Sequence, residues 1–114
     1  MTNAEYVPQR GDIVWILLRR PVGAERVGRE QALVLSPGAY NAQARLVLLC
    51  PVRQRADASP YVVPLPPGLP VQGLILADQV CSVDWETRGA DLICRLPQPT
   101  LRQVQQIALR LLTG

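Results

Sequence analysis

The chain has 114 residues, with twelve arginines, nine acidic residues, no lysine and no histidine, and a formal net charge of +3. This length predicts a single domain over residues 1–114, with room for one hydrophobic core. The lack of histidine excludes histidine general acid–base chemistry, serine–histidine triads and histidine metal sites. Arginine makes forked contacts with phosphate, so the modest positive charge fits a surface that binds nucleic acid.

The sequence contains no segment typical of a membrane span or a secretory signal. No apolar run approaches the roughly 20 residues that cross a bilayer, and the polar residues 1–10 contain no apolar signal core. We therefore expect a cytoplasmic protein without membrane contact. The three cysteines, Cys50, Cys81 and Cys94, lack metal-ligand spacing and are interpreted as small buried residues.

The first part of the chain predicts short strands separated by loops. Residues 13–18 are apolar at every position, which is typical of a strand covered on both faces. Residues 21–31 hold two glycines among charged residues and predict a loop. A second strand is predicted at residues 32–35, followed by a short helical turn at residues 39–44.

The middle of the chain continues the pattern of short strands. Residues 45–52 predict a strand, and residues 53–59 predict a polar loop. Pro64 places the strand at residues 61–65 at an edge or a bulge of the sheet. Further strands are predicted at residues 71–77, 80–85 and 91–96. Together these elements indicate a mainly β or α+β protein that forms a small barrel.

The C-terminal segment predicts an amphipathic helix. Apolar residues recur there at helical spacing: Leu101, Val104, Ile107, Ala108, Leu111 and Leu112. Pro99 fits the first turn of a helix, and Gly114 lies past its end. Because so short a helix is marginal in water alone, we expect its apolar face to pack on the barrel.

Three stretches of sequence together carry a family resemblance. The first is Tyr6-Val7-Pro8 followed by Gly11-Asp12-Ile13-Val14-Trp15. The second runs from Gly23-Ala24-Glu25-Arg26-Val27-Gly28 through Ala32-Leu33-Val34-Leu35-Ser36-Pro37 to Tyr40-Asn41. The third is Leu76-Ala77-Asp78-Gln79-Val80-Cys81-Ser82-Val83-Asp84-Trp85, followed by Arg88-Gly89-Ala90. In order and spacing these stretches resemble the MazF branch of the MazF/PemK toxins over nearly the whole chain.

This resemblance implies an SH3-like small β-barrel with a C-terminal helix, assembled as a homodimer. It also implies an endoribonuclease that cuts single-stranded RNA at short sequences without a metal ion or cofactor, and a MazE-like antitoxin that silences it. DNA would be contacted only through the antitoxin complex. In the implied reaction a ribose 2′-hydroxyl attacks the adjacent phosphodiester, which requires a proton acceptor and a group that stabilises the phosphorane charge.

Two positions depart from the pattern of the family. The resemblance implies an Arg-Pro pair where this chain has Glu30-Gln31, and Arg29 lies one place before that pair. It implies a threonine or serine where the chain has Arg53. Glu25 matches an acidic residue of the family's first long loop. The candidate catalytic residues are therefore Arg29, Arg53 and Glu25, with Glu30 and Arg53 as the altered positions.

These departures leave two functions open. Successive side chains on a strand point to opposite faces, so Arg29 would leave the site if the chain is already extended there, unless a bulge cancels the shift. Glu30 would repel a phosphate, and Arg53 either donates to the phosphate or pairs with Glu30 and seals the site. The protein is then either a ribonuclease that has re-recruited Arg29, Arg53 and Glu25, or a toxin-fold protein that binds antitoxin or nucleic acid and cuts little or no RNA.

Five further residues are candidates for RNA binding: Arg19, Arg20, Arg26, Arg55 and Gln79. The alternative for Arg19 and Arg20 is a surface rim, and for Gln79 it is a turn or a subunit contact. Trp15 and Trp85 have the rings needed to stack on bases. Their apolar neighbours favour packing in the core or in a dimer interface instead.

Overall fold

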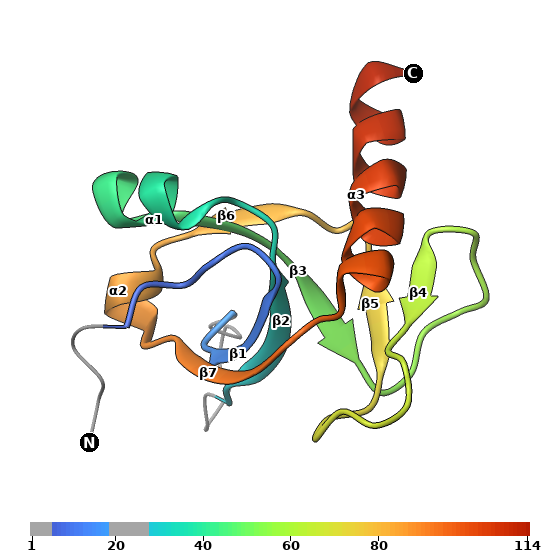
Figure 1. The fold of residues 1–114 in the computed structure, drawn as a ribbon, viewed down its shortest axis with the longest axis horizontal. Coiled ribbons are helices and arrows are strands. Elements are labelled where there is room, and N and C mark those ends of the chain that lie inside the picture. Colours follow the sequence, from blue (N-terminus) through green and yellow to red (C-terminus); the bar gives the residue numbers. More distant parts are fainter. Residues whose placement is uncertain (1–5, 19–27) are drawn as a thin grey trace, which may run out of the picture.

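The protein folds as an antiparallel sheet that curls into a small barrel, with a C-terminal helix beside it (Figure 1). The structure, a computed structural model, describes residues 6–18 and 28–114. Within them the strands are β1 (Asp12–Ile16), β2 (Glu30–Val34), β3 (Val47–Arg53), β4 (Val62–Pro64), β5 (Leu74–Leu76), β6 (Cys81–Val83) and β7 (Asp91–Arg95). The helices of the same part are α1 (Gly38–Ala44), α2 (Trp85–Arg88) and α3 (Gln98–Thr113). Neighbouring strands follow the order β4-β5-β3-β2-β1-β7, and β6 pairs with β3.

Apolar side chains form a core on each face of the sheet, because the central strands send alternate residues to opposite sides. The first core contains Ile13, Leu33, Cys50 and Ile75 from the strands, together with Leu101 and Val104 from α3. The second contains Val14, Ile16, Ala32, Val34 and Leu49. The continuous apolar strand predicted at residues 13–18 is therefore covered on both sides along most of β1.

The C-terminal helix α3 packs on the barrel through its first half. Leu101 and Val104 are buried, whereas Leu111 and Leu112 are exposed, Leu112 to 83%. The prediction that these last two leucines pack on the barrel is therefore wrong for the single chain, because the final turns of α3 extend past the sheet (Figure 1). No helix in the described part of the chain is long and apolar enough to cross a membrane.

Two strand boundaries near the predicted site differ from expectation. β2 begins at Glu30, two residues before the predicted strand, so Glu30 and Gln31 belong to the sheet and not to a loop. β3 extends through Arg53, which was predicted to open a polar loop. In both cases polar side chains occupy the end of a strand, where hydrophobic patterning gives no signal.

The two tryptophans occupy different settings in the fold. Trp15 is 40% exposed and is therefore not packed in the core of the single chain, which leaves a dimer interface as the other predicted setting. Trp85 begins α2 and does not end a strand.

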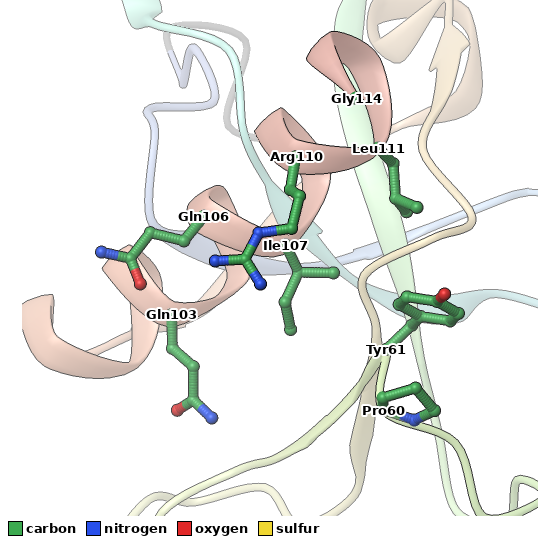
Figure 2. A pocket seen from close by; sticks show the side chains of 8 residues that line it. All are labelled: Pro60, Tyr61, Gln103, Gln106, Ile107, Arg110, Leu111 and Gly114. Atoms are coloured by element: carbon green, nitrogen blue, oxygen red, sulfur yellow. The ribbon is translucent and has the colours of Figure 1, made fainter.

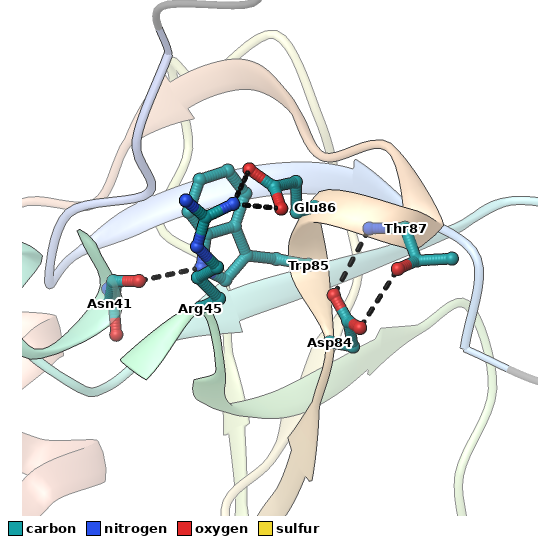
Figure 3. Close-up of polar contacts among 6 residues, drawn as sticks. All are labelled: Asn41, Arg45, Asp84, Trp85, Glu86 and Thr87. Atoms are coloured by element: carbon teal, nitrogen blue, oxygen red, sulfur yellow. Dashed lines mark hydrogen bonds and ion pairs between the residues drawn. The ribbon is translucent and has the colours of Figure 1, made fainter. Parts of the chain in front are cut away.

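The Asp84 carboxylate caps helix α2 by accepting hydrogen bonds from the Thr87 N–H at 3.1 Å and the Thr87 hydroxyl at 2.8 Å (Figure 3). These bonds hold the pKa of the Asp84 carboxyl below its usual range, the backbone bond most of all.

The Gly11-Asp12 motif forms a structural turn into β1. The Asp12 carboxylate is 1% exposed and accepts hydrogen bonds from the Tyr6 hydroxyl at 2.6 Å and the Gln9 N–H at 3.0 Å. Burial raises the pKa of the Tyr6 hydroxyl above its usual value, and the hydrogen bond to Asp12 raises it further. These partners satisfy a buried carboxylate, so we assign this part of the family motif to the fold.

The Tyr40-Asn41 motif forms a second structural network around a fully buried amide. The Asn41 Nδ2 atom donates to the Pro8 carbonyl at 2.7 Å and to the Ser36 carbonyl at 3.1 Å, and the Ser36 hydroxyl donates to Asn41 Oδ1 at 2.5 Å. The Trp85 indole N–H donates to the Asn41 carbonyl at 3.0 Å. One residue therefore ties the N-terminal segment, α1 and α2 together.

An ion pair joins α1 to α2 on the same side of the barrel. Arg45, the C-cap residue after α1, places its Nη1 atom 2.6 Å and 2.8 Å from the two carboxylate oxygens of Glu86 (Figure 3). Both side chains are more than half exposed, at 67% and 53%. Such exposed pairs contribute about 0–1 kcal/mol, so we expect Glu86 to be replaceable without loss of the fold.

We expect Gly73→Ala to destabilise the protein by about 1–3 kcal/mol. Gly73 has a φ of +149°, and an added Cβ would lie 2.9 Å from Val52 Cγ1 and 3.0 Å from the Arg53 carbonyl oxygen. Thermal unfolding of the variant should show a lower Tm than that of the unsubstituted protein. Gly68→Ala is the control, because Gly68 also has positive φ but no atom within 4 Å of an added Cβ. An equal fall in Tm for both variants would contradict the role of close β3–β5 packing.

Candidate functional site

The two altered positions of the sequence lie beside each other at the ends of β2 and β3. Gln31 pairs with Val52 in the antiparallel register, and one further step along both strands places Glu30 opposite Arg53. The Arg53 Nε atom lies 3.2 Å from Glu30 Oε1, with side-chain exposures of 31% and 25%. Opposite charges across two strands stabilise a sheet by about 0.2–1 kcal/mol. The pairing of Glu30 with Arg53, one of the two arrangements considered from sequence, is the one that the structure adopts.

Arg29 lies apart from this pair. Its Nη2 atom donates to the carbonyls of Trp15 at 3.0 Å and Gly89 at 2.6 Å, and it also forms an ion pair with Asp91. These partners belong to β1, to the C-cap of α2 and to β7. The structure therefore does not bring Arg29 to Arg53, as expected for a residue one position out of register on an extended chain.

Four predicted site residues lie outside the described part of the chain: Glu25 of the catalytic set, and Arg19, Arg20 and Arg26 of the RNA-binding set.

Three predicted site residues line one pocket at the end of β3. Arg53, Arg55 and Gln79 lie around a volume of about 360 Å³, which is also lined by Ala56, Asp57, Ser59, Val62, Leu76 and Asp78. The two arginines supply N–H donors and the two aspartates supply acceptors, while Gln79 supplies both. The pocket can therefore bind a ligand with mixed donors and acceptors next to an anionic group.

Sequence reasoning missed three polar residues of this pocket, namely Asp57, Ser59 and Asp78. Asp57 and Ser59 belong to the predicted polar loop, and Asp78 lies in the turn after β5. Their only signal is proximity in sequence to Arg55 and Gln79. Their acceptor oxygens offset the charge of the arginines, so the pocket is not a purely cationic phosphate site.

A second pocket of about 500 Å³ lies between α3 and the segment before β4 (Figure 2). Tyr61, Ile107 and Leu111 form its apolar part, and Gln103, Gln106 and Arg110 its polar part. In Figure 2 the three polar side chains project from α3, and Leu111 lies on the side of the helix nearest Tyr61. Three polar side chains of α3 therefore line one surface hollow.

The cysteines do not converge on either pocket. Cys50 is buried, as predicted, and burial raises the pKa of its thiol to about 12, so the thiol is neutral at physiological pH. Cys81 is exposed and Cys94 is half-buried, so the prediction of burial is wrong for Cys81. Within the described ranges no group of three acidic or cysteine side chains is arranged to hold a metal ion.

The sequence and the fold both match a family of bacterial toxins. The model of PemK-like, MazF-like toxins of type II toxin–antitoxin systems matches residues 9–112. This chain belongs to the PemK/MazF toxin family. The endoribonuclease toxin MazF of Escherichia coli K12 is 38% identical over 87 residues, which are 76% of this chain and 78% of that protein.

Solved structures of the toxin family superpose closely on the barrel. The crystal structure of MazF from Deinococcus radiodurans has a TM-score of 0.87 and 41% identity, and the alignment covers 96% of this chain and 100% of that one. A MazE–MazF complex from the same organism has a TM-score of 0.83 and 41% identity, with 95% and 97% covered. The predicted barrel with a C-terminal helix is therefore confirmed.

Proposed function

We propose that this protein is the toxin of a type II toxin–antitoxin pair and that it cuts single-stranded RNA in the cytoplasm without a metal ion. One observation carries the proposal: Arg53, Arg55 and Gln79, chosen from sequence, lie around one pocket where β3 ends. Arginine and amide groups bind phosphates and base edges. Since related toxins are named as endoribonucleases, RNA is the ligand that the pocket fits best.

The exposed apolar side chains support a homodimer as the working form. Tyr40, Leu48, Val80, Leu109 and Leu112 line a hollow of about 570 Å³ between α1, β3 and α3. Each of these side chains is at least 38% exposed. Contiguous exposed apolar surface of this kind marks an interaction site in soluble proteins, and a second copy of the chain would cover the leucines that α3 leaves in solvent.

A MazE-like antitoxin is the proposed regulator. Structures of MazE–MazF complexes are among the similar folds, and an antitoxin that covers the Arg53 pocket would keep RNA out. Any contact with DNA would then come through the antitoxin.

The Glu30–Arg53 pair favours a second candidate function. A carboxylate 3.2 Å from Arg53 competes with RNA phosphate for the same guanidinium, and Arg29 is held elsewhere by Asp91. A toxin-fold protein with this arrangement would bind antitoxin or nucleic acid and cut poorly or not at all. The two candidates differ in one measurable property, the cleavage of RNA.

Incubation of the purified protein with a long single-stranded RNA in the presence of EDTA tests the proposal. We expect discrete fragments that end in a 2′,3′-cyclic phosphate, because the 2′-hydroxyl is the proposed nucleophile. Added MazE-like antitoxin should stop the cleavage. Intact RNA after incubation with an excess of folded protein would contradict the proposal and support the second candidate.

A further inference from the structure

The Glu30–Arg53 pair contains the two kinds of group that cleavage by a 2′-hydroxyl needs, a proton acceptor and a fixed cation. We propose that Glu30 is the general base of RNA cleavage and Arg53 the group that stabilises the phosphorane, so that the ion pair is the resting form of the catalytic pair. This inference rests on the proposed ribonuclease function. It differs from the implied family arrangement, in which the strand-β2 position carries an arginine and not an acid.

The position of Arg53 allows it to serve both the pair and the substrate. Its Nε atom makes the contact with Glu30, and the same side chain lines the pocket that also contains Arg55 and Gln79. A guanidinium has further N–H donors on its Nη atoms, and these can bind phosphate oxygens in a fork. A phosphate bound to Arg53 would therefore lie beside the Glu30 carboxylate.

In the resting protein the Glu30 carboxylate contacts the guanidinium at Nε, 3.2 Å away. A phosphate on the Nη atoms would share the positive charge of Arg53 with Glu30 and so weaken the ion pair. Glu30 is 25% exposed, so part of its side chain faces solvent. With the phosphate on the Nη atoms, the proposed arrangement places the Glu30 carboxylate next to the ribose whose 3′-oxygen carries that phosphate.

The proposed step balances in atoms and protons. The 2′-hydroxyl gives its proton to the Glu30 carboxylate as the 2′-oxygen forms a bond to phosphorus. The bond between phosphorus and the 5′-oxygen breaks, which leaves a 2′,3′-cyclic phosphate and an alcohol. Glu30 then returns its proton to solvent, and solvent protonates the departing 5′-oxygen, while Arg53 stabilises the extra negative charge of the intermediate.

The opposite interpretation of the pair, a seal that blocks the pocket, predicts the opposite response to one substitution. Glu30→Gln keeps the shape of the side chain and removes its ability to accept a proton. If Glu30 is the base, cleavage at saturating RNA should fall by about 10²–10⁴-fold, while RNA binds equally or more tightly because its competitor for Arg53 is weakened. If Glu30 is a seal, Glu30→Gln should bind RNA more tightly and also cut it faster.

Glu86→Gln is the matched control, because it neutralises the acid of another Glu–Arg pair, with Arg45 at 2.6 Å. We expect its cleavage rate and RNA affinity to equal those of the unsubstituted protein. Cleavage by Glu30→Gln at or above the unsubstituted rate overturns the inference and leaves the ribonuclease function intact. Absence of cleavage by the unsubstituted protein overturns both. Loss of cleavage with retained RNA binding in Glu30→Gln supports the inference, since misfolding would remove both properties.

Discussion

Arg53→Ala is expected to lower the rate of RNA cleavage by about two to three orders of magnitude, the usual cost of losing one donor to a transition-state anion. The loss has two physical sources. The phosphorane loses the guanidinium that stabilises it. Glu30, which in the unsubstituted protein lies 3.2 Å from Arg53, loses its partner and keeps a charge that repels the phosphate. RNA affinity should also fall. The slope of the logarithm of the affinity against the logarithm of the salt concentration should become shallower by about 0.7, the value for one phosphate contact on a single strand. Single-turnover cleavage and binding at several salt concentrations measure these effects.

Arg102→Ala is the control for the effect of charge alone. Arg102 is exposed on α3 and does not line the pocket at the end of β3. This variant should cut RNA as fast as the unsubstituted protein. If both arginine variants lose the same amount of activity and affinity, the effect comes from net charge and the pocket has no special role.

Asn41→Ala is expected to destabilise the protein by about 2–4 kcal/mol, because several buried groups lose their partner at once. The fully buried amide bonds the Pro8 and Ser36 carbonyls, and its oxygen accepts from the Ser36 hydroxyl. For a domain of this size the change corresponds to a fall in Tm of about 8–20 °C. Chemical denaturation monitored by tryptophan fluorescence gives the free energy of unfolding directly.

Gln43→Ala is the control for this substitution, since it removes an amide from an exposed position further along the same helix. We expect little change in its free energy of unfolding. A similar loss in both variants would contradict the role of the buried network, since alanine is a better helix former than either amide. Tight RNA binding at low temperature should survive in Asn41→Ala, since the amide lies outside the proposed site.

The strands and the terminal helix could be predicted because each has a local signal. Residues 13–18 are apolar throughout, and β1 lies between two cores. Pro99 lies in the first turn of α3, and Gly114 caps its end. The exposure of Leu112 could not be predicted, because helical periodicity identifies an apolar face and does not identify the surface that covers it.

The site was predictable in its residues and less so in its arrangement. Opposite charges at Glu30 and Arg53 indicated a possible pair, but the choice between pairing and separation depends on the register of β2 and β3. That register follows from packing along both strands, for example of Leu33 opposite Cys50. The direction of the Arg29 side chain could not be predicted, because it depends on where the strand begins. β2 begins one residue after Arg29.

The opposed position of Glu30 and Arg53 restricts how such a site can change during evolution. Replacement of Glu30 alone by arginine would place two guanidinium groups next to each other, which repel. Replacement of Arg53 alone by threonine would leave the Glu30 carboxylate without its cationic partner. Residues 30 and 53 should therefore change together among related toxins, so the residue at one position predicts the residue at the other.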